Sequence, residues 1–289
     1  MNFQNVVLAP GLYFVTTPIG NARDITLRAL DILASADVIA AEDTRTARKL
    51  MDIHGVALGG RRLIAYHDHS GDAVTGRLIS EMAAGKSVAY VSEAGTPLVA
   101  DPGYELGKAA ADAGLYVTTA PGASAVLAAL TVSGLPTDRF LFVGFLPSGQ
   151  TQREAEIAAL RDIPFTMVFY ESPKRVYEML SSLCQLLGGE RVAVVARELT
   201  KKFEEVSRGT LSDLKNAFEN RTVKGEIVVL VGRDGAQSVD FQDVEAALLE
   251  ALKTMRVKDA ATAVAGAMGL RRRDVYQQAL ELGRKTDAT

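Results

Sequence analysis

Short apolar runs alternate with stretches of helical periodicity over the first 135 residues of the chain. Five runs are rich in Val, Ile, Leu, Ala and Tyr, and a segment with apolar residues every three or four positions follows each. Strands this apolar, separated by helices, are typical of a parallel sheet that is covered on both faces. The predicted strands are 12–18, 38–42, 63–67, 87–93 and 116–120, and the predicted helices are 24–36, 44–54, 72–85, 104–113 and 123–132.

The pattern changes after the segment SGLPTDR at 133–139. Four further apolar runs follow, and helical segments separate only some of them, which predicts a second α/β domain with a mixed sheet. One helix is expected in ESPKRVYEMLSSLCQLL, where Ser172 can cap the first turn and Pro173 suits the first helical position. The predicted strands of this domain are 139–147, 165–171, 191–197 and 226–232.

The composition shifts again after Gly235, where three short amphipathic segments predict three helices. The last two are joined around Gly269, a helix-turn-helix-like arrangement. This tail either packs on the body with solvated charges or contacts RNA through the basic start of its last helix, at Arg271, Arg272 and Arg273. The predicted organisation is therefore two α/β domains and a helical tail, at 1–135, 136–236 and 240–289.

Composition and charge exclude several classes of protein. The net charge of −3 argues against a uniformly basic nucleic-acid-binding protein, although a local basic face would still bind RNA. The single cysteine, Cys184, excludes intrachain disulfides and a cysteine-based zinc cluster. The sequence has neither an apolar run long enough for a membrane span nor a recognisable signal peptide, so we expect a cytoplasmic protein.

Three short motifs suggest other chemistry but are incomplete. The GKS at 85–87 lacks the first glycine of a phosphate-binding loop, and it ends a predicted helix where such a loop opens one. No GxGxxG follows the first strand, which leaves little support for a nicotinamide cofactor. In HDH at 67–69, two histidines flank an aspartate, but the sequence identifies no third ligand, so we expect no metal site.

Three loops of small residues hold the most informative chemistry. They follow the first, fourth and fifth strands of the predicted parallel sheet and read TTPIGN, SEAGTPLVADPG and APGASA. Their common position is the carboxyl edge of the sheet, where open α/β folds bind ligands. They contain no Lys or Arg, so a cationic or zwitterionic ligand suits them better than a phosphate, with Glu93 and Asp101 facing positive charge. Alternatively, they are tight turns that only close the sheet.

These loops are part of a wider set of stretches that match the sequences of one known family. The stretches are TTPIGNARDITLRAL, AEDTRTARKL, SEAGTPLVADPG, PGASAVLAAL, GFLP, FYESPKRV, RELTKKFEE and KGEIVVLVG, and they cover most of residues 11–232. Through these stretches, the chain resembles the tetrapyrrole methylase superfamily, whose members bind S-adenosylmethionine between two α/β domains. Within it, the chain is similar to the branch that methylates a cytidine 2′-hydroxyl in 16S ribosomal RNA. One mild departure is Glu93, where the family often has Asp.

The resemblance implies a cofactor site that is lined from both domains. A sulfonium ligand without phosphate agrees with loops that bear acids and lack lysine. The helix behind the third loop is expected to be capped by Ser124. The implied cofactor-binding residues are Pro18, Glu93, Ala94, Gly95, Thr96, Val99, Asp101, Ser124, Ala125, Tyr170, Leu199 and Glu226.

The implied reaction is in-line transfer of a methyl group from sulfur to a ribose oxygen, which needs no metal. The protein would align the reacting atoms and help to remove the hydroxyl proton. The candidates for catalysis are Glu42, Asp43 and Lys174, and the sequence does not choose among them. Phosphates of RNA could bind to Arg23, Arg45, Arg175, Lys202 and the three tail arginines. Each of these charged residues could instead form a structural ion pair.

Two other functions stay open at this point. One is a methyltransferase of the same fold that acts on a small tetrapyrrole, and the other is an RNA-binding regulator without catalysis. The basic tail, together with EDTR and YESPKRV, favours RNA as the substrate. The expected partner is 16S rRNA within the small ribosomal subunit, and the resemblance implies a homodimer. We expect neither a membrane nor a DNA partner.

Overall fold

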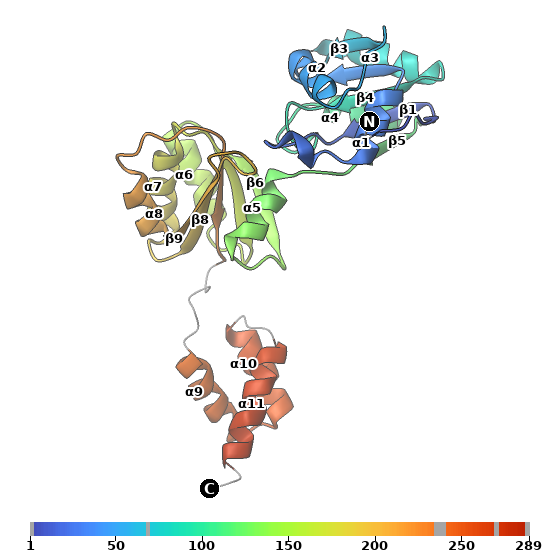
Figure 1. Cartoon of the computed structure of the whole chain (residues 1–289). Coiled ribbons are helices and arrows are strands. Elements are labelled where there is room, and N and C mark those ends of the chain that lie inside the picture. Colours follow the sequence, from blue (N-terminus) through green and yellow to red (C-terminus); the bar gives the residue numbers. More distant parts are fainter. Residues whose placement is uncertain (1–2, 68–69, 234–240, 269–271, 287–289) are drawn as a thin grey trace.

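The computed structural model describes residues 3–67, 70–233, 241–268 and 272–286. They form two α/β domains, one built on a parallel sheet and one on a mixed sheet, followed by a helical tail (Figure 1). The predicted fold class is thus confirmed. Within the described ranges, no helix is long and apolar enough to cross a membrane.

The first domain is built on a five-stranded sheet in the order β3-β2-β4-β1-β5, and every neighbouring pair is parallel. The central strands are buried along their whole length, as their apolar sequences require. Because all five strands run the same way, the loops that follow them meet at one edge of the sheet. The strands are β1 (Gly11–Val15), β2 (Val38–Ala41), β3 (Arg62–Ala65), β4 (Ser87–Val91) and β5 (Val117–Ala120).

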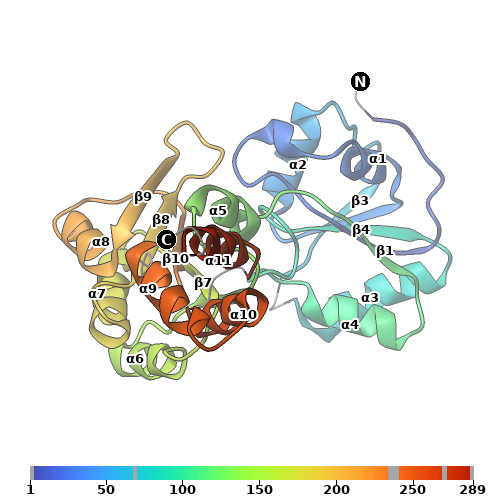
Figure 2. The same cartoon turned by 90° about the horizontal axis from the view of Figure 1, so that it is seen from below.

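Helices cover both faces of this sheet (Figure 2). On one face, α1 and α2 pack with Tyr13 and Val15, and on the other α3 and α4 pack with Leu12 and Phe14. This alternation along β1 is the period-two arrangement of a strand with both faces buried. The helices are η1 (Ala22–Asp24), α1 (Leu27–Ser35), α2 (Thr44–Ile53), α3 (Gly71–Ala83) and α4 (Tyr104–Asp112).

The second domain contains a mixed sheet in the order β6-β7-β10-β8-β9, in which only β6 and β7 are parallel. One apolar cluster joins this sheet to α6, α7 and α8, and another joins its other face to α5. The strands are β6 (Phe140–Phe145), β7 (Thr166–Glu171), β8 (Val192–Arg197), β9 (Glu205–Thr210) and β10 (Ile227–Val231). The helices are α5 (Ala125–Ser133), α6 (Gln150–Ala159), α7 (Val176–Leu187) and α8 (Leu211–Phe218).

In the second domain, one helix start was predicted wrongly and one strand was missed. Helix α7 begins at Val176, not at Pro173, because Ser172 forms a turn in which its carbonyl accepts the Arg175 N–H at 3.1 Å. The polar strand β9 was not predicted. It lies at the sheet edge, where Glu205 accepts hydrogen bonds from Arg197 and Arg221, so its sequence needs no apolar run.

The tail consists of α9 (Phe241–Leu252), α10 (Val257–Met268) and α11 (Arg272–Thr286). They share a small apolar core that includes Leu248, Val264 and Val275. The described part of the last helix begins with Arg272 and Arg273, which are both exposed. Arg271, which we also expected at this helix start, lies outside the described residues, as does Gly269.

Candidate functional site

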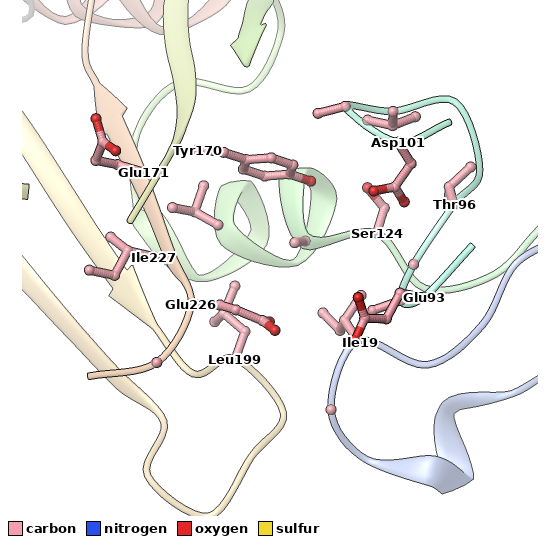
Figure 3. Close-up of a pocket in the computed structure, with 18 of the residues that line it drawn as sticks. Ile19, Glu93, Thr96, Asp101, Ser124, Tyr170, Glu171, Leu199, Glu226 and Ile227 are labelled. Atoms are coloured by element: carbon pink, nitrogen blue, oxygen red, sulfur yellow. The ribbon is translucent and has the colours of Figure 1, made fainter. Parts of the chain in front are cut away.

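A cavity of about 590 Å³ lies between the carboxyl edge of the first sheet and the second domain. Figure 3 shows Thr96, Asp101 and Glu93 on one side of it, and Tyr170 and Glu226 on the other. All of the predicted cofactor-binding residues line this cavity, and so does Glu42, one of the three candidates for catalysis. Residues that were not predicted to bind the cofactor also line it, among them Ile19, Gly20, Thr46, Ala100, Phe145 and Glu171.

The first-domain wall is made by loops that are hydrogen-bonded to one another. Thr17 and Gly95 exchange two backbone bonds, with N···O distances of 2.9 and 3.1 Å, which join the loops after β1 and β4. The Thr96 hydroxyl donates to the Ala123 carbonyl at 3.0 Å and so connects the loop before α5. Gly95 has a φ of 80°, which a residue with a Cβ rarely adopts. These bonds hold small residues and their backbone groups at the cavity surface.

Ser124 caps α5 as predicted, because its hydroxyl accepts the Leu127 N–H at 3.5 Å. The helix therefore begins at the cavity wall. In the loop after β4, Leu98 and Ala100 adopt left-handed backbone conformations, with φ values of 73° and 60°, and Ala100 lines the cavity. Such conformations cost about 1–3 kcal/mol each and gather at functional sites, so this loop is held in shape by its surroundings.

Tyr170, at the end of β7, forms much of the opposite wall. Its ring makes edge contacts with Phe142 and Phe145, at centroid distances of 5.0 and 5.6 Å. Burial, and secondarily the Asp101 carboxylate, raises the pKa of Tyr170 to about 12. The phenol is thus a neutral hydrogen-bonding group at neutral pH, and its ring gives this wall an apolar surface.

The charges around the cavity are one-sided. Five carboxylate side chains line it and, among the described lining residues, there is no lysine or arginine. Glu171 is almost fully buried and is paired with Arg175 at 2.7 Å, so its charge is compensated. Glu226 also has a cationic partner, Lys201 at 3.0 Å, but Lys201 does not line the cavity. The four carboxylates other than Glu171 therefore still give the cavity surface an excess of acid, which favours a ligand that carries positive charge and disfavours a phosphate. They are Glu42, Glu93, Asp101 and Glu226.

The three candidates for catalysis have different surroundings. Glu42 lines the cavity, and its carboxylate accepts the Glu93 N–H at 3.0 Å. Asp43 does not line it. Instead it caps α2 and pairs with Arg45 at 2.8 Å, which lowers the pKa of Asp43 to about 2. Lys174 is exposed and is not among the lining residues, although its neighbour Pro173 is.

The predicted RNA-binding cations are also not equivalent. Arg175 is bound to Glu171 and to the Leu146 carbonyl. Arg45 is held by Asp43, and Lys202 lies over the Phe203 ring with its nitrogen 5.6 Å from the centroid. Arg23 is exposed in η1. Of the predicted cations that the structure describes, therefore, Arg175 is the one whose charge is most fully used inside the fold.

Two further cations, on α2, were not predicted to bind RNA. Arg48 and Lys49 are exposed, and neither joins the ion pairs found among the described residues. With Arg45 they line a second, shallower cavity of about 450 Å³, next to Asp52. The i, i+3, i+4 spacing on a predicted helix would have placed these three cations on one face.

The remaining sequence motifs do not add a site. Lys86 of GKS pairs with Glu81, and the Ser87 N–H and hydroxyl both donate to Asp37. In the described part of the chain, no group of three or more His, Cys, Asp and Glu side chains is arranged to hold a metal. Asp68 and His69 of the HDH motif lie outside the described residues.

Comparison with known proteins places this geometry in context. A family model described as Tetrapyrrole (Corrin/Porphyrin) Methylases matches residues 11–215, and one described as RsmI C-terminal HTH domain matches residues 238–283. The Ribosomal RNA small subunit methyltransferase I of Mesorhizobium japonicum is 48% identical over 276 residues, 95% of this chain and 93% of that protein. Its namesake from Xylella fastidiosa is 43% identical over 265 residues, 89% of this chain and 96% of that protein.

A solved structure with the same fold is the uroporphyrin-III C-methyltransferase from Thermus thermophilus, complexed with S-adenyl homocysteine. It aligns with a TM-score of 0.54 at 21% identity. The alignment covers 97% of that chain but only 77% of this one. The alignment therefore includes nearly all of the uroporphyrin enzyme but leaves part of this chain unmatched.

Proposed function

The chain belongs to the tetrapyrrole methylase family, and on that premise we propose that it methylates 16S ribosomal RNA with S-adenosylmethionine, at a cytidine 2′-hydroxyl. The observation that carries the proposal is the extent of the similarity. Relatives named as ribosomal RNA methyltransferases match up to 95% of the chain, and a family model covers the tail. A tetrapyrrole substrate would leave the tail without a purpose.

The cavity fits the proposed cofactor on three counts. Its volume of about 590 Å³ lies within the usual range for small-molecule sites. Its lining carries carboxylates and lacks lysine and arginine, which suits a ligand with positive charge and no phosphate. Small residues such as Gly95 and Ala125 let a ligand approach the backbone closely. Bound there, S-adenosylmethionine would supply a methyl group on a positively charged sulfur, so the protein needs only to align and deprotonate the acceptor oxygen.

We assign the proton acceptor to Glu42. Its carboxylate lines the cavity and is held in place by the Glu93 N–H. Asp43 is a poorer base, because Arg45 keeps its pKa near 2, and Glu171 is already paired with Arg175. Tyr170 presents a neutral phenol and an apolar ring, which exclude water from the wall of the cavity. In this scheme, Glu42 takes the hydroxyl proton as the oxygen–methyl bond forms and the sulfur–methyl bond breaks.

RNA would be held outside the cavity. The exposed cations Arg23, Arg45 and Lys202 lie on the loops and helices around the site, and Arg272 and Arg273 begin the described part of α11. Phosphate contacts from such residues fix position without reading sequence. The proposal includes a homodimer in the cytoplasm, with exposed apolar side chains such as Leu127 and Phe140 available for a second copy.

The decisive experiment uses small ribosomal subunits from cells that lack this protein. They are incubated with the purified protein and S-adenosylmethionine carrying a labelled methyl group, and the RNA is digested and mapped by mass spectrometry. We expect one labelled methyl group on a cytidine ribose. Label on a base, or label on an added tetrapyrrole and none on RNA, would refute the proposal.

The Glu42→Gln variant tests the assigned base in the same assay. It should bind S-adenosylmethionine normally but lose about 100-fold or more in kcat, the usual contribution of a general base. Asp43→Asn is the comparison, since the assignment gives Asp43 no proton to accept. If Asp43→Asn loses as much kcat as Glu42→Gln while both proteins stay folded, the assignment is wrong.

A further inference from the structure

The loop between β8 and β9 holds two residues in a conformation that side chains rarely adopt. Glu198 has a φ of 50° and Thr200 a φ of 65°, and neither is glycine. A left-handed backbone is especially unfavourable for a β-branched residue such as threonine. It persists only where the surroundings fix it, and it is found preferentially at functional sites. The contacts of this loop therefore indicate what it is built to hold.

Its strongest contacts fix the segment before β10. The Glu198 N–H donates to the Glu226 carbonyl at 2.9 Å, and the Glu226 N–H donates to the Glu198 carboxylate at 3.0 Å. Lys201 then joins both acids, with its Nζ 3.0 Å from a carboxylate oxygen of each. The Glu226 N–H, above all, lowers the pKa of Glu198. Burial works to lower the pKa of Lys201, but its bonds to the two acids outweigh burial and raise it.

The same loop meets the first domain across the cavity edge. The Asn21 N–H donates to the Thr200 hydroxyl at 3.1 Å. At Gly20 there is no room for a side chain, because a Cβ would lie 2.5 Å from Cγ of Lys201 and 2.7 Å from the Thr200 hydroxyl. One small loop thus touches both walls of the cleft.

Three residues of this contact region line the cavity itself, including Leu199, whose carbonyl oxygen would lie 3.0 Å from a Cβ at Gly20. They are Gly20 from the first domain and Leu199 and Glu226 from the second. Figure 3 shows Leu199 and Glu226 together on one side of the cavity and Ile19 on the other. Lys201 does not line the cavity, so its effect on a ligand must pass through these neighbours.

We propose that Lys201 is a positioning residue that holds the Glu226 wall in place for the cofactor, an inference that rests on the proposed function. Its ammonium group is the cation shared by Glu198 and Glu226. Without it, the two carboxylates would lose the cation that they share, and their repulsion would be opposed mainly by the bond from the Glu226 N–H to the Glu198 carboxylate. The Glu226 wall, which also includes Gly225, would then move away from Glu198, and the cavity would open beside Gly20.

The test compares Lys201→Met with Lys201→Arg, and with Lys224→Met as a matched control. Lys224 is exposed, lies in the segment before β10 and joins no ion pair among the described residues. Binding of S-adenosylmethionine is measured by calorimetry, thermal stability by melting, and kcat and KM on small ribosomal subunits. We expect Lys201→Met to raise Kd and KM for S-adenosylmethionine about tenfold, as for loss of a charged hydrogen bond.

In the same variant, kcat at saturating cofactor should change less than about twofold, because Lys201 does not touch the reacting atoms. Lys201→Arg should restore most of the affinity, and Lys224→Met should bind like the wild type. A Kd within twofold of the wild type in Lys201→Met would overturn the inference. So would a kcat loss larger than the KM change, or equal weakening in Lys224→Met. Wild-type protein that binds no S-adenosylmethionine would instead refute the proposed function.

Discussion

Replacing Arg48 and Lys49 together by alanine should weaken RNA binding and reduce its dependence on salt. Both side chains are exposed on α2 and line the shallow cavity beside Arg45. Because no ion pair within the described residues uses them, their charges are available to phosphates. Thr46, on the same helix, lines the main cavity, so RNA bound along α2 would lie next to the site of methyl transfer.

The size of the effect follows from the number of free cations. Each neutralised phosphate contributes about 0.7 to 0.9 to the slope of log affinity against log salt, so losing two should reduce the slope by about 1.4 to 1.8. Between about 50 and 200 mM salt, the advantage of the wild type over the variant should therefore shrink about 7- to 12-fold. Filter binding of labelled small ribosomal subunits over this range measures the slope directly.

The matched control removes the same charge from the opposite face of the first sheet. Arg77 on α3 and Lys108 on α4 are exposed, and these helices cover the face away from α2. Their double alanine variant should keep the wild-type slope. Equal slopes for both variants would refute the reasoning, since the loss would then reflect net charge alone and not a surface on α2.

Three further predictions concern the cavity, the fold and the tail. Gly95→Trp should abolish S-adenosylmethionine binding in calorimetry. Gly95→Ala is the control, because it carries the same backbone penalty at a φ of 80° without the bulk, and it should retain most of the binding. Arg221 first, and then Arg197, lower the pKa of Glu205 to about 2. Ionised Glu205 therefore stabilises the fold above its unfolded pKa near 4.5, and that contribution is lost as the pH falls toward 2. Glu205→Gln should therefore lower the urea midpoint at pH about 7, by an amount that shrinks in acid; a constant difference would contradict this. Replacing Arg272 and Arg273 by alanine should flatten the salt dependence of RNA binding. The melting temperature should not fall, because cations at the start of a helix oppose its dipole. Lost stability with an unchanged salt dependence would assign the two arginines to packing.

The position of the cavity could be predicted from the sequence, because it follows from the order and direction of the strands in the first sheet. Five apolar strands separated by helices imply a parallel sheet, and a parallel sheet brings its carboxyl-end loops to one edge. The predicted cap at Ser124 was also found, since capping depends only on local chemistry. The partners of the charged side chains could not be predicted in this way. Arg175 is bound to Glu171, whereas Lys49 joins no ion pair in the part of the chain that the structure describes. This difference depends on packing, and residue type alone does not carry that information.

The missed strand β9 has a similar cause. Its sequence, EVSRGT, is polar because it is an edge strand, and its stability comes partly from Glu205 binding arginines of two other segments. Ion pairs between segments that are distant in the sequence produce no periodic pattern of residues. The late start of α7 is likewise set by the turn at Ser172 and by the Glu171 carboxylate, which accepts the Ser172 N–H at 2.7 Å. Local preference at Ser172 and Pro173 was overridden by these contacts.

The separation of charge between the cavity and its surroundings also limits what can enter. Acids such as Glu93 and Glu226 line the cavity, whereas Arg48 and Lys49 lie outside it on α2. A phosphate brought to about 4 Å from one carboxylate would meet a repulsion of about 4 kcal/mol at an effective dielectric constant of 20. On the proposed function, the RNA backbone is therefore held by the outer cations and only an uncharged part of a nucleotide enters. A ribose hydroxyl meets that condition, and Glu42 is the group that we propose accepts its proton.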